Sequence, residues 1–192
     1  MAQNGLAYTE NPYDAERYQQ VLAVAAEMAA AGDETEAASV LELFRAETGY
    51  ATPKVDVRGV VFSDGRLLLV HGTDDDRWTM PGGWADVGEA PSQAVEKEIR
   101  EESGYPARAV RLLGVQNRDL RERGPWPFHA YKLFFLCELL ADEPGPRTGV
   151  ETDAIGFFAE DELPELSRKV GDHGVGWLFE RERDPSRPPL FD

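Results

Sequence analysis

The stretch Gly83–Tyr105, GWADVGEAPSQAVEKEIREESGY, decides the fold. Proline is favoured in the first turn of a helix and glycine just after its end, so Pro91 and Gly104 predict a helix over residues 91–103. The second half of that helix carries four glutamates, with two basic residues among them. A run of charged residues is usually a solvent-exposed helix face. The spacing of the glutamates therefore decides whether they form such a face or a functional site.

Helical phase places most of these glutamates near the apolar side of the helix. Three apolar residues share one side: Ala94, Val95 and Ile99. The opposite side, predicted to face solvent, holds Gln93, Glu96, Arg100 and Ser103. Glu98, Glu101 and Glu102, related as i, i+3 and i+4, project close to the apolar side. Partly desolvated carboxylates need a raised pKa or a compensating cation, and oxygen ligands suit Mg²⁺ or Mn²⁺ better than zinc.

Composition bounds the class of protein. The chain has 192 residues, 42% of them hydrophobic, and a net charge of −16, which argues against binding to duplex nucleic acid. A phosphate-bearing substrate remains compatible if metal ions supply positive charge locally. Cys137 is the single cysteine, so an internal disulfide is excluded, and the histidines lack zinc-ligand spacing. The N-terminus lacks a signal-peptide pattern and YKLFFLCELL is too short to span a bilayer, so we expect a cytoplasmic protein without membrane partners.

The chain divides into two parts. Residues 1–52 predict a helical extension: one helix begins after Asn11 and stops at Gly32, and a second begins at Asp33 or Thr35 and ends before Gly49. This pair is too small to bury both of its apolar stripes alone, so it must pack on the rest of the chain or on another copy.

Residues 53–192 change to strand periodicity. VDVRGVVF and RLLLVHG, joined by SDG, predict a hairpin. Further strands are predicted at ARAVRLLGVQ, FHAYKLFFLCELL and AIGFF, with a short helix at AEDELPEL and a C-terminal helix around Trp177. Together with the glutamate helix, these elements predict an α/β fold, a mixed sheet in an α/β/α sandwich.

The opening stretch resembles the signature of the Nudix hydrolases, G-x5-E-x7-R-E-U-x-E-E-x-G-U, where U is a bulky apolar residue. Eight of the nine defined positions fit, and the exception is Lys97, which stands where the family has arginine. The preceding MPGG and the later GFFAEDELPEL are also similar to the family. The resemblance covers residues 54–165, and the leading helices extend it to a subgroup that is active on CDP-choline and uses its N-terminal helices in a dimer.

The resemblance implies a metal-dependent hydrolysis of a pyrophosphate. Water activated by Mg²⁺ or Mn²⁺ attacks phosphorus, with the ions bridging carboxylates and pyrophosphate oxygens. The positions that match the family's metal ligands are Glu98, Glu101 and Glu102, and the carbonyl of Gly83 adds a further candidate ligand.

Three more residues are assigned by the resemblance. Glu89 matches a carboxylate that supports the metal site without binding the metal. Lys97 stands where the family has an arginine that pairs with neighbouring carboxylates through two N–H groups, and lysine offers those carboxylates a point charge instead. Glu151 stands where relatives place a loop glutamate that binds metal or acts as general base, although its position in TGVETD equally fits a solvated loop residue. The general base stays open between Glu98, Glu151 and neither.

The segment NRDLRERGPWPFHAY is the candidate substrate loop. Its arginines fit phosphate, and its aromatic rings fit a base or a quaternary ammonium. The predicted substrate-binding residues are Arg118, Trp126, Phe128 and Tyr131. A solvated loop with a Trp/Phe anchor explains the same composition.

The sequence therefore predicts a pyrophosphohydrolase, a homodimer, that acts on a nucleoside diphosphate linked to a small group, with CDP-choline as the leading candidate. ADP-ribose or a nucleotide sugar is the alternative of the same enzyme class. An RNA 3′-end exonuclease and a nucleotide sensor without catalysis are the rivals, and a sensor would tolerate loss of carboxylates that this chain retains.

Overall fold

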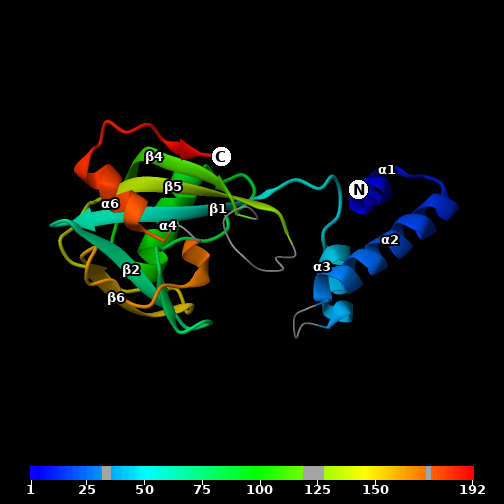
Figure 1. Ribbon diagram of the computed structural model, residues 1–192, viewed down its shortest axis with the longest axis horizontal. Coiled ribbons are helices and arrows are strands. Elements are labelled where there is room, and N and C mark those ends of the chain that lie inside the picture. Colours follow the sequence, from blue (N-terminus) through cyan, green and yellow to red (C-terminus); the bar gives the residue numbers. More distant parts are fainter. Residues whose placement is uncertain (32–35, 119–127, 172–173) are drawn as a thin grey trace. The chain divides into compact units, whose positions relative to one another are not determined.

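Figure 1 shows the computed structural model, which describes residues 1–31, 36–118, 128–171 and 174–192. The chain forms two compact units, one centred on Met1–Pro53 and the other containing the strands and helices from Lys54 onward. The division falls next to the boundary expected after residue 52. In the described part of the chain, no helix is long and apolar enough to cross a bilayer.

The first unit consists of the helices α1 (Ala2–Tyr8), α2 (Pro12–Ala30) and α3 (Ala37–Ala46). The predicted N-cap of α2 is confirmed, since the Asn11 side-chain oxygen accepts a hydrogen bond from the Tyr13 N–H at 2.9 Å. Helix α1 was not predicted. The start expected for α3, at Asp33 or Thr35, lies outside the described residues.

The second unit is built on a mixed sheet. Its strands are β1 (Lys54–Ser63), β2 (Arg66–Gly72), β3 (Arg77–Thr79), β4 (Ala107–Asn117), β5 (Ala130–Leu139), β6 (Thr152–Phe158) and β7 (Leu190–Phe191). The order across the sheet is β3-β2-β1-β5-β4-β7, and β6 pairs with β2. Strands β1 and β5 run parallel, whereas β1 and β2 form the predicted antiparallel hairpin. Asp64 and Gly65 both have positive φ at its turn, 50° and 72°, which is the backbone that an Asp-Gly turn supplies.

Side chains of β1 alternate between two apolar cores. Val57 and Val61 pack with the helix α4 (Pro91–Ser103), and Val60 packs on the other face with the helix α6 (Gly176–Arg183) and Val170 of the short helix η1 (Arg168–Val170). The sheet is thus covered on both faces, and the predicted α/β/α layering is confirmed (Figure 1).

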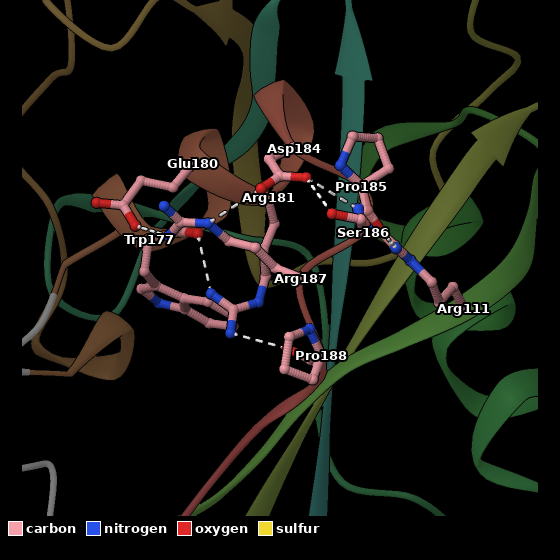
Figure 2. Close-up of polar contacts among 9 residues, drawn as sticks. All are labelled: Arg111, Trp177, Glu180, Arg181, Asp184, Pro185, Ser186, Arg187 and Pro188. Atoms are coloured by element: carbon pink, nitrogen blue, oxygen red, sulfur yellow. Dashed lines mark hydrogen bonds and ion pairs between the residues drawn. The ribbon is translucent and has the colours of Figure 1, made fainter.

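The C-terminal segment is fastened to α6 by a buried arginine (Figure 2). The Arg181 guanidinium lies 5.0 Å from the centroid of the Trp177 ring and donates to the Pro188 carbonyl at 3.2 Å. Arg187 forms an ion pair with Glu180 in the same group. These contacts hold the segment that leads into β7, which closes the sheet beside β4.

The predicted short helix at AEDELPEL is wrong, because residues 159–166 form a turn followed by an extended segment. Pro164 lies in the middle of this stretch, and proline both lacks an N–H and disfavours helix for the residue before it. Leu163 and Leu166 instead pack against the core on the α6 face of the sheet.

Candidate active site

Helix α4 has the boundaries that the sequence predicts. It begins at Pro91 and ends at Ser103, and Gly104 takes a left-handed conformation with φ 79°. The Gly104 N–H closes the last turn on the Arg100 carbonyl at 2.9 Å. The helix therefore has a fixed end next to its glutamates.

The predicted buried side of α4 is confirmed, and the side predicted to face solvent is confirmed only in part. Ala94, Val95 and Ile99 are fully buried. Ser103, expected in solvent, is also fully buried; its hydroxyl donates to the Ile99 carbonyl at 2.5 Å and accepts from the Tyr105 N–H at 3.2 Å. That prediction is wrong because Ser103 lies one helical turn after Ile99 and therefore next to the buried side of the helix.

Glu102 is the most buried of the three candidate metal ligands. Its carboxylate accepts a hydrogen bond from the Gly82 N–H at 2.9 Å, and burial raises its pKa to about 7. Gly82 is required at this close approach, since a Cβ there would lie 2.0 Å from the Val57 carbonyl oxygen. The MPGG turn therefore delivers a backbone donor to a desolvated carboxylate.

Glu98 lies against the next glycine. A Cβ on Gly83 would come within 3.1 Å of a Glu98 carboxylate oxygen. Burial and the charge of Glu101 raise the pKa of Glu98. The Gly83 carbonyl accepts from the Val57 N–H at 2.8 Å, so one of its two lone pairs remains for a further partner.

Backbone contacts fasten the loop before β6 to the end of α4. The Glu101 carbonyl accepts from the Gly149 N–H at 3.0 Å, and the Glu102 carbonyl accepts from the Thr152 hydroxyl at 3.0 Å. Glu151 lies between these two attachment points, and its charge contributes to the raised pKa values of Glu98 and Glu102. The structure thus brings this loop glutamate within electrostatic range of the helix carboxylates.

The donor set fits a hard divalent cation by its chemistry. All candidate ligands are carboxylate or carbonyl oxygens, and the desolvation that raises the pKa values of Glu98 and Glu102 favours a positive charge beside these two carboxylates. Across the described ranges, no three His, Cys, Asp or Glu side chains already form a complete metal site.

Lys97 joins the loop before α4 to the helix. Its ammonium group contacts the Asp86 carboxylate at 3.0 Å and the Glu89 carboxylate at 3.1 Å. These hydrogen bonds, which Lys97 donates first to Asp86 and then to Glu89 in order of effect, raise the pKa of Lys97. Lysine at this signature position therefore makes two separate ion pairs where an arginine fork would favour a bidentate one.

The candidate substrate loop is described in part. Trp126 lies outside the described residues, Phe128 groups with the N-terminal unit, and Tyr131 is exposed on β5. Arg118, directly after β4, places its guanidinium carbon 5.5 Å from the centroid of the Trp84 ring. Sequence reasoning missed Trp84, although its position immediately after the Gly82-Gly83 pair was a usable signal.

Comparison with known proteins identifies the family. The sequence model of the NUDIX domain matches residues 52–175. A protein of Bacillus subtilis strain 168, named putative ADP-ribose pyrophosphatase YjhB, is 41% identical over 193 residues, covering 100% of this chain and 92% of the relative. The chain belongs to the Nudix family. It is a Nudix hydrolase, an enzyme that acts on phosphoric anhydride bonds.

The extension of this Nudix hydrolase matches a second model, described as a UDP-X-like, N-terminal oligomerisation domain, over residues 1–44. A crystal structure of a UDP-X diphosphatase is similar over 100% of this chain and 92% of its own, with 31% identity and a TM-score of 0.66. An ADP-ribose pyrophosphatase from Streptococcus suis 89-1591 covers 73% of this chain and 100% of its own, with 34% identity and a TM-score of 0.65. The CDP-choline subgroup stays a prediction.

Proposed function

We propose that this Nudix hydrolase cleaves the pyrophosphate bond of a nucleoside diphosphate linked to a second small group, using Mg²⁺ or Mn²⁺. The observation that carries the proposal is the pair Glu98 and Glu102, desolvated at one end of α4 beside the Gly82–Gly83 turn. A carboxylate pair held in this way gains a large stabilisation from a divalent cation, and a pyrophosphate needs the same charge.

Each carboxylate has a proposed role. Glu98, Glu101 and Glu102 hold the ions, with the Gly83 carbonyl as an additional ligand, and Glu89 with Lys97 keeps the preceding loop in place. Mg²⁺ or Mn²⁺ held by these residues would lower the pKa of a bound water and offset the negative charge of the phosphates. Glu151 or Glu98 accepts the proton of that water; Glu151 is anchored for this through its carbonyl, which accepts from the Thr73 N–H at 2.9 Å.

The proposed substrate class is a nucleoside diphosphate with a sugar or alcohol as its second group. CDP-choline is the candidate that the sequence favours, and the names of the relatives add ADP-ribose and UDP-linked compounds. These compounds share the pyrophosphate bond that is proposed to be cleaved, and they differ in the base and in the second group.

A substrate panel tests the proposal. CDP-choline, ADP-ribose, a UDP-sugar, a dinucleoside polyphosphate and a short RNA are incubated with the protein and Mg²⁺ or Mn²⁺, and products are separated by ion exchange. We expect a nucleoside monophosphate and a phosphorylated second group from at least one of the first three. Absence of turnover on every compound, with either ion, would overturn the hydrolase assignment.

We also propose that residues 1–52 mediate a homodimer while residues 53–192 carry the site. Val21, Val24 and Met28 recur at i, i+3 and i+7 on α2 and are all exposed, between 53% and 73%. They lie on the side of the helix away from the buried Ala26. An exposed apolar stripe of this kind fits a second copy of the chain.

A further inference from the structure

A row of polar and aromatic side chains crosses the sheet, beginning at the residue that follows the Gly82–Gly83 turn. Trp84 forms an isolated bridge with Asp56 of β1, Asp56 is paired with Lys132 of β5, and Lys132 is paired with Gln116 of β4. Directly paired residues project from the same face of a sheet. We call Trp84, Asp56, Lys132 and Gln116 the polar row.

The polar row lies on the face of the sheet opposite α4. Asp56 is separated by four residues along β1 from Val60, which packs with α6, so the two point to the same side. Three strand spacings separate the ends of the row, about 14 Å in all. Trp84 directly follows Gly83, at which an added Cβ would lie 3.1 Å from a Glu98 carboxylate oxygen, so the row begins one residue away from a candidate metal ligand.

Hydrogen bonding within the polar row is uneven. The two carboxylate oxygens of Asp56 accept from Arg58 at 2.7 and 2.9 Å, and the Lys132 ammonium donates to the Lys169 carbonyl. The side-chain amide nitrogen of Gln116 has no partner within the described ranges, although this residue is only 5% exposed. A buried amide without a partner is unfavourable, so this donor is either a defect of the core or a group kept for a ligand.

The other end of the polar row offers an aromatic surface. Trp84 is 45% exposed, and one side of its ring carries the Arg118 guanidinium. Arg118 directly follows β4, and its contact with the Trp84 ring places a cation at this end of the row. An exposed indole ring, a cation and a buried amide donor are the groups that flank a nucleobase and bind its polar edge.

We propose that the polar row binds the nucleoside part of the substrate, with Trp84 flanking it and the Gln116 amide bonded to the edge of the base. This inference rests on the proposed function, since a diphosphate held at Glu98 and Glu102 directs the nucleoside onto the row. Gln116 is thereby a specificity-determining residue, and the second group of the substrate extends away from it.

Replacing the amide tests the assignment. Gln116→Met keeps length and removes the hydrogen-bonding groups. We expect the ratio of kcat/KM between UDP-glucose and ADP-glucose, which differ only in the base, to change by about tenfold or more. The ratio between UDP-glucose and UDP-galactose, which differ only in the second group, stays constant. A changed sugar ratio with an unchanged base ratio overturns the proposal, as does an equal change in kcat/KM for all substrates.

Thr79→Val is the matched control. The Thr79 hydroxyl of β3 is also buried without a partner among the described residues, but it lies outside the polar row. This variant should leave the base ratio unchanged, and a shift equal to that of Gln116→Met would contradict the assignment. Trp84→Leu alters an exposed residue and serves if Gln116→Met does not fold; we expect a KM raised about tenfold with a smaller change in kcat. An unchanged KM overturns the proposal.

A nucleotide-binding measurement tests this inference independently of the proposed hydrolase function. Calorimetric titration with UMP, CMP and AMP needs no turnover. A preference for one base in the wild-type protein, lost in Gln116→Met, supports the polar row even if no substrate is hydrolysed. Equal or undetectable binding of all three nucleotides by a protein that hydrolyses nucleotide sugars would overturn the row and leave the hydrolase assignment standing.

Discussion

The two units of this chain bury their apolar side chains to very different extents. In the Nudix unit, long runs of β1 and β2 are fully buried, including Val57, Val60 and Leu67 to Val70. In the described part of the helical unit the buried apolar residues are small or few: Ala2, Ala26 and Val40. The Nudix unit therefore has its own core, whereas the helices leave apolar side chains exposed. This contrast supports the proposal that one unit carries the site and the other mediates assembly.

The largest expected effect is a loss of activity, without loss of assembly, when a candidate metal ligand is replaced. Glu98→Gln removes a charge from the candidate metal ligands, so kcat on the best substrate of the panel should fall by about 10³-fold or more. The mass in solution should not change, because the substitution lies outside the helical unit. Full activity in this variant would remove Glu98 from the site.

The next effect tests the helical unit. Val24→Asp with Met28→Glu places two charges in the exposed stripe of α2, which should dissociate the dimer as measured by light scattering. Gln19→Glu, at an exposed polar position seven residues before the buried Ala26 and therefore off the stripe, is the control and should leave the mass unchanged. If the double variant remains dimeric, the stripe is not the interface.

A smaller effect concerns stability without metal. Burial raises the pKa of Glu102 from 4.5 to about 7, so the folded protein binds more protons than the unfolded chain between these values. The free energy of unfolding contributed by this group falls as pH rises through that window, by up to about 3 kcal/mol. Glu102→Gln should therefore stabilise the metal-free protein more at pH 8 than at pH 5, as measured by urea unfolding in EDTA. An equal difference at both pH values would show that Glu102 is not desolvated.

The smallest effect is expected at Lys97. Lys97→Arg restores the guanidinium of the family signature and retains ion pairs with Asp86 and Glu89, so kcat should be equal to or up to severalfold above that of the wild type. Lys97→Met is the comparison that removes the charge. A large loss of kcat in Lys97→Arg would show that the lysine has a role that an arginine guanidinium cannot fill.

Much of the fold follows from local signals in the sequence. Pro91 and Gly104 mark α4 because each is suited to one end of a helix, and Asp64-Gly65 marks the hairpin because its backbone requires positive φ. The layering follows from strand periodicity combined with helix periodicity in one chain. The failed helix at residues 159–166 shows the limit of composition, since Pro164 outweighed the acidic start.

The sequence predicts the part of the candidate site that lies on a single helix. Glu98 and Glu102 follow from helical phase, whereas Ser103 was assigned to the solvent side although it lies one turn after the buried Ile99. The polar row could not be predicted, because it joins residues from three strands and the turn after Gly83. Strand order and register set such a row, and neither is readable from local pattern.

The most direct test of the carboxylate site is Mn²⁺ binding measured by electron paramagnetic resonance on the substrate-free protein. Glu102→Gln should weaken Mn²⁺ affinity by about tenfold or more, as loss of one ligand charge requires. Glu96→Gln is the control on the same helix: Glu96 accepts from the Ala109 N–H at 2.9 Å, a bond that glutamine preserves, and its variant should bind Mn²⁺ as the wild type does. Equal Mn²⁺ affinity in the wild type and Glu102→Gln would contradict the account.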